Sequence, residues 1–216
     1  MFANREDAGR QLAEAVAGRG WTDPVVLALP RGGVPVGVEI AQRLRTPLDI
    51  LMVRKLGAPG RPELAMGAVA RTGESTDVVV NSDVVQLLGV TDSVIEATKA
   101  AELAVIAERE SRYNGKRARP GIKGRTAIVV DDGVATGATM RAALRAARHA
   151  APAWLVLAVP VAPPDAVRHL SKEADEVISL QQPADLGAIG VYYRDFAQVE
   201  DGEVMAALAR HTNPAK

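Results

Sequence analysis

The sequence predicts an α/β fold in which a parallel sheet is flanked by helices. Short apolar runs without an alternating polar face recur along the chain, as is typical of strands buried on both sides of a sheet. Segments with apolar residues at helical spacing separate these runs, and strands that alternate with helices pair in parallel through right-handed crossovers. A chain of 216 residues suffices for one sizeable core, so we expect a single domain over residues 1–216.

The first part of the chain is expected to hold two helices and two strands. Asn4 is a suitable N-cap for a helix whose apolar residues share one face, and two glycines end this helix. Residues 25–29 form an apolar run between two prolines and are predicted as the first buried strand. A helical pattern follows over residues 34–44, and residues 48–53 are predicted as the second strand.

The middle of the chain is predicted to contain a loop, a hairpin and a long helix. Two prolines and a glycine within residues 59–62 disfavour regular structure at that point. Short strands are expected at residues 65–70 and 78–80, followed by a charged helix over residues 92–113. A basic linker at residues 116–125 then leads to the last part of the chain.

The last part of the chain continues the alternation of strands and helices. Residues 126–130, 155–159 and 177–180 are apolar runs and are predicted as strands. Residues 140–147 have one apolar helical face, and residues 164–170 form a helix with proline in its first turn. This order of elements completes the predicted parallel sheet.

Composition and charge exclude several classes of protein. Lys plus Arg equal Asp plus Glu at 26 each, so no global charge favours nucleic acid or an anionic membrane as a partner. The chain has no cysteine, which excludes disulfides, thiolate nucleophiles and Cys-ligated zinc. No stretch approaches the roughly 18 apolar residues of a membrane span, and the N-terminus is charged at once. We therefore expect a cytoplasmic protein without a membrane partner.

The loop after the strand at residues 126–130 combines acids, glycines and threonines. It begins with Asp131 and Asp132 and continues as Gly133-Val134-Ala135-Thr136-Gly137-Ala138-Thr139 into a helix. Ligands of open α/β sheets bind beyond the carboxyl ends of the strands, where such a loop can point several N–H groups at one phosphate. Carboxylates beside this phosphate suit sugar hydroxyls or magnesium. Alternatively, the aspartates cap the next helix and the glycines only form its turn.

Residues 129–139 resemble the signature that binds 5-phosphoribosyl 1-pyrophosphate (PRPP) in type I phosphoribosyltransferases. In that signature, an apolar strand leads to two acidic residues and a Thr-Gly-x-Thr phosphate loop. The resemblance implies a Rossmann-like parallel sheet flanked by helices with a small hood, to which about residues 181–216 and the N-terminal helix contribute. It also implies that Asp131 and Asp132 contact the ribose and Mg²⁺, the metal through PRPP or water. The 5-phosphate would be bound by Gly133, Val134, Ala135, Thr136, Gly137, Ala138 and Thr139.

A second loop, Pro30-Arg31-Gly32-Gly33, follows the first predicted strand and opens a helix. A guanidinium beside two glycines suits a pyrophosphate, because arginine donates two parallel hydrogen bonds and glycine permits close approach. The type I family has its pyrophosphate loop at this place in the topology. In the alternative interpretation, Arg31 is a surface residue on a tight turn.

A third basic segment, residues 54–63, leaves the second predicted strand. Its start with Arg54 and Lys55 is similar to the mobile active-site loop of the family, which closes over PRPP and stabilises departing pyrophosphate. Arg61 lies in the same segment. The alternative is a basic loop that is merely solvated.

Residues 189–196 resemble the hood segment of hypoxanthine-guanine phosphoribosyltransferases, where an apolar or aromatic side chain covers the base. By this resemblance, the base-binding residues are Ile189, Tyr192 and Asp195. Core packing explains the aromatic residues of the segment, Tyr192, Tyr193 and Phe196, equally well.

The acceptor base cannot be read from the sequence. Enzymes for 6-oxopurines carry an aspartate where this chain has Ala135, and a lysine where it has Pro160-Val161-Ala162-Pro163. The stretch Ala135-Thr136-Gly137 and the pair Arg54-Lys55 resemble adenine phosphoribosyltransferases, yet the hood does not. The sequence best fits the group of phosphoribosyltransferases without a defined acceptor.

The resemblance implies an enzyme that transfers the 5-phosphoribosyl group from PRPP to a nitrogenous base and releases pyrophosphate, with Mg²⁺ as cofactor. Family members often form homodimers. The alternative is a PRPP-sensing or RNA-binding regulator on the same fold. Its support is a group of basic residues: Arg109, Arg112, Lys116, Arg117, Arg119, Lys123 and Arg125. A P-loop NTPase is excluded because no Gly-Lys-Ser/Thr sequence is present.

Overall fold

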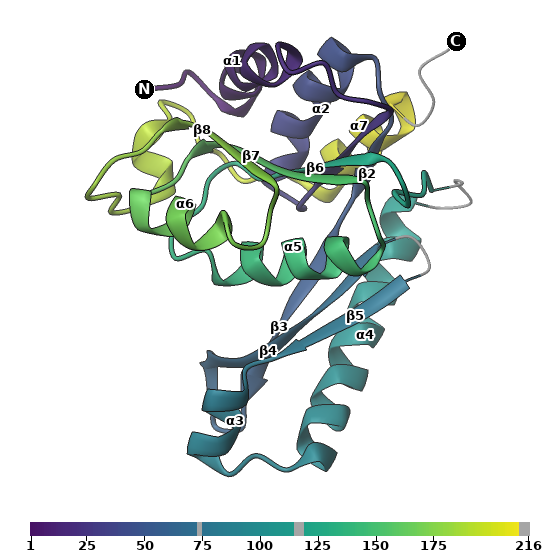
Figure 1. Ribbon diagram of the computed structural model, residues 1–216, viewed down its shortest axis with the longest axis vertical. Coiled ribbons are helices and arrows are strands. Elements are labelled where there is room, and N and C mark those ends of the chain that lie inside the picture. Colours follow the sequence, from purple (N-terminus) through teal and green to yellow (C-terminus); the bar gives the residue numbers. More distant parts are fainter. Residues whose placement is uncertain (73–74, 115–118, 212–216) are drawn as a thin grey trace.

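The computed structural model describes residues 1–72, 75–114 and 119–211 and contains two sheets (Figure 1). The larger sheet has five strands in the order β2-β1-β6-β7-β8, and all its neighbouring strands pair in parallel. The predicted α/β fold is therefore confirmed. The strands are β1 (Pro24–Ala28), β2 (Leu48–Ile50), β6 (Thr126–Val130), β7 (Trp154–Val161) and β8 (Glu176–Gln181).

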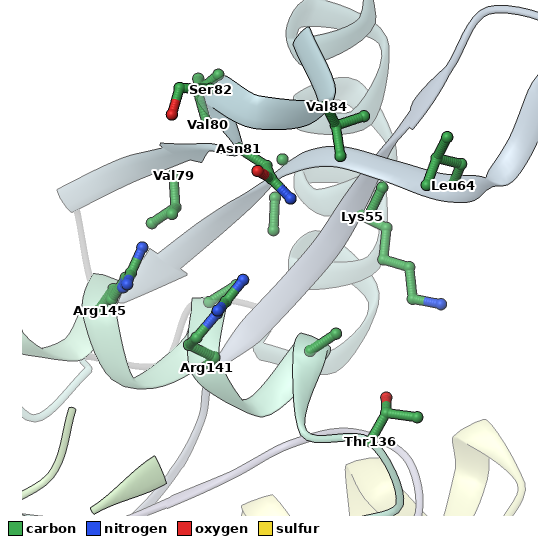
Figure 2. Close-up of a pocket in the computed structure, with 15 residues that line it drawn as sticks. Lys55, Leu64, Val79, Val80, Asn81, Ser82, Val84, Thr136, Arg141 and Arg145 are labelled. Carbon is green, nitrogen blue, oxygen red and sulfur yellow. The ribbon is translucent and has the colours of Figure 1, made fainter. Parts of the chain in front are cut away.

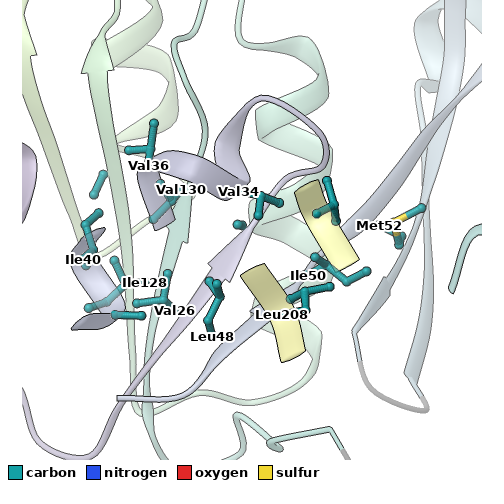
Figure 3. Close-up of a cluster of buried hydrophobic side chains, with 14 of the residues drawn as sticks. Val26, Val34, Val36, Ile40, Leu48, Ile50, Met52, Ile128, Val130 and Leu208 are labelled. Carbon is teal, nitrogen blue, oxygen red and sulfur yellow. The ribbon is translucent and has the colours of Figure 1, made fainter. Parts of the chain in front are cut away.

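Helices cover both faces of this sheet, which explains why its strands are apolar throughout. Alternate residues of β6 belong to two separate cores, Ile128 to one and Val129 to the other. The core around Ile128 also contains Leu208 and is shown in Figure 3. Its helices are α1 (Arg5–Ala17), α2 (Gly33–Leu44) and α7 (Asp201–His211), whereas α5 (Ala138–His149) and α6 (Pro164–Leu170) cover the opposite face.

The smaller sheet extends away from the larger one in Figure 1 and forms an arm with two helices. Its antiparallel strands, in the order β3-β4-β5, are β3 (Met52–Ala58), β4 (Arg61–Thr72) and β5 (Ser75–Val80). The helices of the arm are α3 (Ser82–Leu88), which the sequence patterns did not indicate, and α4 (Asp92–Asn114). We call the described residues between 52 and 114 the arm.

The prediction of one strand over residues 48–53 and a loop over residues 54–63 was wrong. The strand is interrupted at Leu51, and β3 then runs through Ala58 into the second sheet. Leu56 and Ala58 are buried, so this segment is held by packing of its apolar side chains. The pairing of β3 with β4 is irregular next to Gly57, and residues 59–60 form the turn. Gly60 adopts the positive φ of 69° that such a turn favours.

The N-terminal residues pair with the segment before α7, beside the larger sheet. The amide of Phe2 donates to the carbonyl of Tyr192 at 2.8 Å, and the amide of Arg194 donates to the carbonyl of Phe2 at 2.9 Å. The rings of Phe2 and Phe196 both pack against Tyr193. As predicted, the side chain of Asn4 caps α1. No helix in the described part of the chain is both long and apolar enough to cross a membrane.

Candidate functional site

The loop between β6 and α5 presents a group of free backbone amides. Within the described part of the chain, the amides of residues 135–139 have no hydrogen-bond acceptor. Gly137 adopts a φ of 79°, a left-handed conformation that favours glycine, and precedes the first turn of α5. Ala135, Thr136 and Ala138 are exposed, so an anion can reach these amides. We call residues 135–139 the phosphate cradle.

Val134 was predicted to share in this cradle, but its amide is already used. It donates to the carbonyl of Val161 at 2.9 Å. Gly133 is buried as well, and a Cβ at that position would lie 2.6 Å from Cγ2 of Ile189. Gly133 and Val134 therefore hold the loop against β7 and the C-terminal segment, while the five residues after them are exposed or half-buried.

The two aspartates lie directly before the cradle in different environments. Burial raises the pKa of Asp131 well above its usual range, and the neighbouring carboxylate of Asp132 raises it further. Burial also raises the pKa of Asp132, but the guanidinium of Arg5 lies 2.7 Å away and opposes this shift. The carbonyl of Asp132 accepts a hydrogen bond of 2.5 Å from the hydroxyl of Tyr193. Arg5 was missed because no local sequence signal connects it with this loop.

The loop Pro30-Arg31-Gly32-Gly33 packs directly against the aspartates. A Cβ on Gly32 would collide with the carboxylate of Asp132, and a Cβ on Gly33 would lie 2.6 Å from the carbonyl oxygen of Val130. The glycines thus permit close approach of two protein loops. The Pro30–Arg31 peptide bond is cis. The Arg31 guanidinium lies 3.8 Å from the carboxylates of both Glu200 and Asp201, which places it near the start of α7.

Arg54 and Lys55 lie on a strand and not on the mobile loop that was predicted. Neighbouring side chains of a strand point to opposite faces, so the structure separates the two cations. Nε of Arg54 lies 2.7 Å from Oε2 of Glu102 on α4. Lys55 is exposed and lines a cavity on the other side, next to Thr136 of the phosphate cradle.

Arg109 on α4 is a candidate that sequence reasoning assigned only to the basic group. It lines a small pocket of about 100 Å³ together with Pro30, Asp131 and Thr139. Within the described residues, the Arg109 side chain has no carboxylate partner. Only the packing of the arm brings it to the aspartates.

The other described members of the basic group give less support to RNA binding. Arg112 pairs with Glu108 and Asp201, and Arg125 pairs with Asp23. Arg119 is largely buried, with Asp49 and Glu110 as partners. Lys123 is exposed, whereas Lys116 and Arg117 lie outside the described residues.

A pocket of about 550 Å³ adjoins the phosphate cradle at Ala135 and Thr136 and is larger than the pocket at Arg109. Its wall includes Ala135, Thr136, Pro163, Pro164 and Leu186. None of the three residues predicted to bind a base belongs to this wall. Ile189 instead packs on Gly133, the Tyr192 hydroxyl donates to the carbonyl of Asp185 at 3.4 Å, and Asp195 accepts the amide of Ala197 at 3.0 Å.

Comparisons with known proteins indicate a single family. A family model described as "Phosphoribosyl transferase domain" matches residues 2–195. A Mycobacterium tuberculosis protein named "Putative phosphoribosyl transferase Rv0571c" is 46% identical over 97% of this chain. The crystal structure of TT1426 from Thermus thermophilus is 45% identical, with a TM-score of 0.86 and coverage of 98% of this chain and 99% of that chain. The chain spans about half the length, 47%, of the curated relatives it matches.

Proposed function

The chain belongs to the phosphoribosyltransferase family, and on this premise we propose that it transfers the 5-phosphoribosyl group of PRPP to a nitrogenous base. One observation carries the proposal: within the described residues, five amides without a hydrogen-bond acceptor lie beside two carboxylates at the carboxyl end of β6. A phosphorylated sugar matches both parts, since amides bind the phosphate and carboxylates accept hydrogen bonds from hydroxyl groups.

In this proposal the phosphate cradle holds the 5-phosphate. The free amides of residues 135–139 and the start of α5 supply positive potential, and the hydroxyls of Thr136 and Thr139 add donors. Fixing the phosphate at one end of the sugar fixes the distance from the cradle to the reacting C1 atom. The cradle therefore contributes mainly by positioning the substrate.

Asp131 and Asp132 would hold the ribose hydroxyls. Arg5 already neutralises much of the charge on Asp132, so Asp131 is the carboxylate with capacity for a further cation. Carboxylate oxygen is a ligand that Mg²⁺ prefers, and this fits a Mg²⁺ ion held by one protein carboxylate together with water and PRPP oxygens. Such an ion would neutralise charge on the pyrophosphate.

Departing pyrophosphate would lie towards Arg31 and Arg109. The bond from C1 to the pyrophosphate oxygen breaks, its electron pair leaves with that oxygen, and a base nitrogen forms the new bond to C1. Any proton on that nitrogen is lost to solvent. Arg109 lines a pocket together with Asp131 and with Pro30, which precedes Arg31 in its loop. The Arg109 guanidinium can therefore stabilise the leaving group. Lys55 borders the cradle at Thr136, where it adds positive potential near the 5-phosphate.

The acceptor base would occupy the 550 Å³ pocket that adjoins the cradle at Ala135 and Thr136. Two prolines, Pro163 and Pro164, and the side chain of Leu186 offer it apolar contact. Ala135 supplies no acid for the base. The C-terminal segment, which carries Leu186 and pairs with the N-terminal residues, would act as the hood.

The test is a panel of purine and pyrimidine bases incubated with PRPP and Mg²⁺, with pyrophosphate release as the readout. We expect release with one class of base, and loss of release in Asp131→Asn. Asp92→Asn removes an exposed carboxylate at the start of α4, away from the cradle and the base pocket, and is the matched control. Ribose 5-phosphate binding without release for any base would favour the PRPP-sensing regulator. Failure of the chain to bind ribose 5-phosphate would refute the assignment of the cradle.

A further inference from the structure

A cavity of about 590 Å³ separates the arm from α5 (Figure 2). One wall is formed by α5, from which Arg141 and Arg145 point towards the arm. The opposite wall is formed by β3, β4, β5 and the start of α3. The cavity adjoins the phosphate cradle at Thr136 but continues along α5 beyond it.

The cavity has an unbalanced positive charge. Its lining contains Lys55, Arg141 and Arg145, and no aspartate or glutamate is among the lining residues that the structure describes. Arg145 is bound by Glu173 at 2.6 Å, outside this lining. Within the described part of the chain, the side chains of Arg141 and Lys55 have no hydrogen-bond or ion-pair partner.

The position of Arg141 within α5 makes this lack of a partner informative. Arg141, Arg145 and His149 are spaced four residues apart and so share one helical face. His149 lies 2.8 Å from Asp77, and Arg145 is paired with Glu173. Of these three side chains, only Arg141, which is nearest the cradle, has no carboxylate partner among the described residues.

The opposite wall offers apolar surface and an amide. Leu64, Val79 and Val84 line it, and the side chain of Asn81 lies between this surface and α5 (Figure 2). The Asn81 side chain does not cap α3. A ligand that matches both walls has an anionic end for the cations and a flat, partly apolar body with polar edges for Asn81.

We propose that this cavity is a second binding site, which takes a nucleotide. Its phosphate groups bind Arg141 and Lys55, and its base packs on the apolar wall of the arm beside Asn81. The volume lies within the range of small-molecule sites, about 300–1,000 Å³. Because the ligand touches both α5 and the arm, binding links the position of the arm to the nucleotide. The inference rests on Arg141 and Asn81, which have no part in the proposed transfer reaction, whereas Lys55 borders both sites.

The probe is ATP in magnesium-free buffer, titrated by calorimetry with ribose 5-phosphate present at saturation. We expect ATP to bind under this condition. Arg141→Gln, which removes the charge at similar length, should weaken ATP binding at least tenfold, equivalent to about 1.4 kcal/mol. Asn81→Ala changes the other wall and should weaken it at least threefold. Arg148→Gln removes a cation of the same helix that pairs with Asp175 outside the cavity, and should change the affinity less than twofold.

The proposal is overturned if ATP does not bind, if ribose 5-phosphate displaces it, or if Arg141→Gln and Arg148→Gln weaken binding equally. Arg141 is exposed, so its replacement should leave the fold intact, and circular dichroism checks this. If ribose 5-phosphate itself fails to bind, the assignment of the cradle is lost. The nucleotide site is then judged by the dependence of ATP binding on Arg141 and Asn81 alone.

Discussion

The guanidinium of Arg5 lies 2.7 Å from Oδ2 of Asp132, although 127 positions separate the two residues in the chain. The same guanidinium stacks on the ring of Phe196 at 3.8 Å and donates to the carbonyl of Ala197 at 2.7 Å. Arg5 therefore joins the loop of the proposed sugar site to the C-terminal segment. Both Arg5 and Asp132 are buried, so water cannot readily solvate either charge if the other is removed.

Replacing Arg5 by alanine should destabilise the protein by about 3 kcal/mol, because Asp132 is left buried without its counter-charge. Urea unfolding measures this change. Arg10→Ala on the same helix removes an exposed arginine whose carboxylate partners lie 3.7 and 3.9 Å away, and it should cost less than about 0.5 kcal/mol. Equal effects of the two substitutions would contradict a structural role for the Arg5–Asp132 pair.

The raised pKa of Asp131 predicts a stability that depends on pH. The folded protein keeps a proton on this carboxyl at pH values where the unfolded chain has lost it. Stability from this group is therefore present below the usual pKa of 3.8 and is lost as pH rises through the folded-state pKa. Asp131→Asn removes the titration and should make the ligand-free protein more stable than wild type at pH 8.

The stability difference between Asp131→Asn and wild type should shrink as pH is lowered towards 4. Thermal unfolding at a series of pH values measures it, with Asp185→Asn as an exposed control. The same Asp131→Asn substitution should abolish transfer activity, because the proposed sugar and magnesium contacts are lost. A difference that does not vary with pH would show that burial of the charge is not the cause.

The glycines at positions 33 and 18 provide a matched pair for the packing of the two loops. A Cβ at Gly33 would lie 2.6 Å from the carbonyl oxygen of Val130 and 2.9 Å from Cα of Asp131, both backbone atoms. We expect Gly33→Ala to destabilise the fold by about 1–3 kcal/mol, as overpacking of a close contact does. A Cβ at Gly18 would meet open space, and the φ of −68° at this position suits alanine. The stability of Gly18→Ala in urea unfolding should therefore equal or slightly exceed that of the wild type.

The parts of the fold that depend on local patterns were predictable from the sequence. The helix at Pro164–Leu170 was predicted with its observed bounds, because proline marks its first turn and the apolar spacing defines its length. The strand Thr126–Val130 was also predicted in full, since its residues are buried on both faces. The composition of its following loop indicated a phosphate site, which stays a prediction.

The first hairpin of the arm and the partners of the aspartates could not be read from local patterns. Prolines and glycines predicted a loop where β3 and β4 form a hairpin, because cross-strand pairing and burial of Leu56 outweigh local propensity. The contact of Arg5 with Asp132 arises only when the folded chain brings α1 against the loop after β6. Charge counts likewise gave no hint that Arg119 would be buried among carboxylates.

Arg109 provides the sharpest test of where pyrophosphate lies. It lines the pocket next to Asp131 and Pro30 without a described carboxylate partner, so its charge is available to a ligand. We expect Arg109→Gln to weaken pyrophosphate binding at least tenfold in calorimetry, because loss of a charge-assisted hydrogen bond costs about 1.5–3 kcal/mol. Arg112→Gln, three residues further along α4, removes a guanidinium already held by Glu108 and Asp201 and should change the affinity less than twofold. If both substitutions weaken binding alike, the effect is long-range electrostatics, and Arg109 does not contact the leaving group.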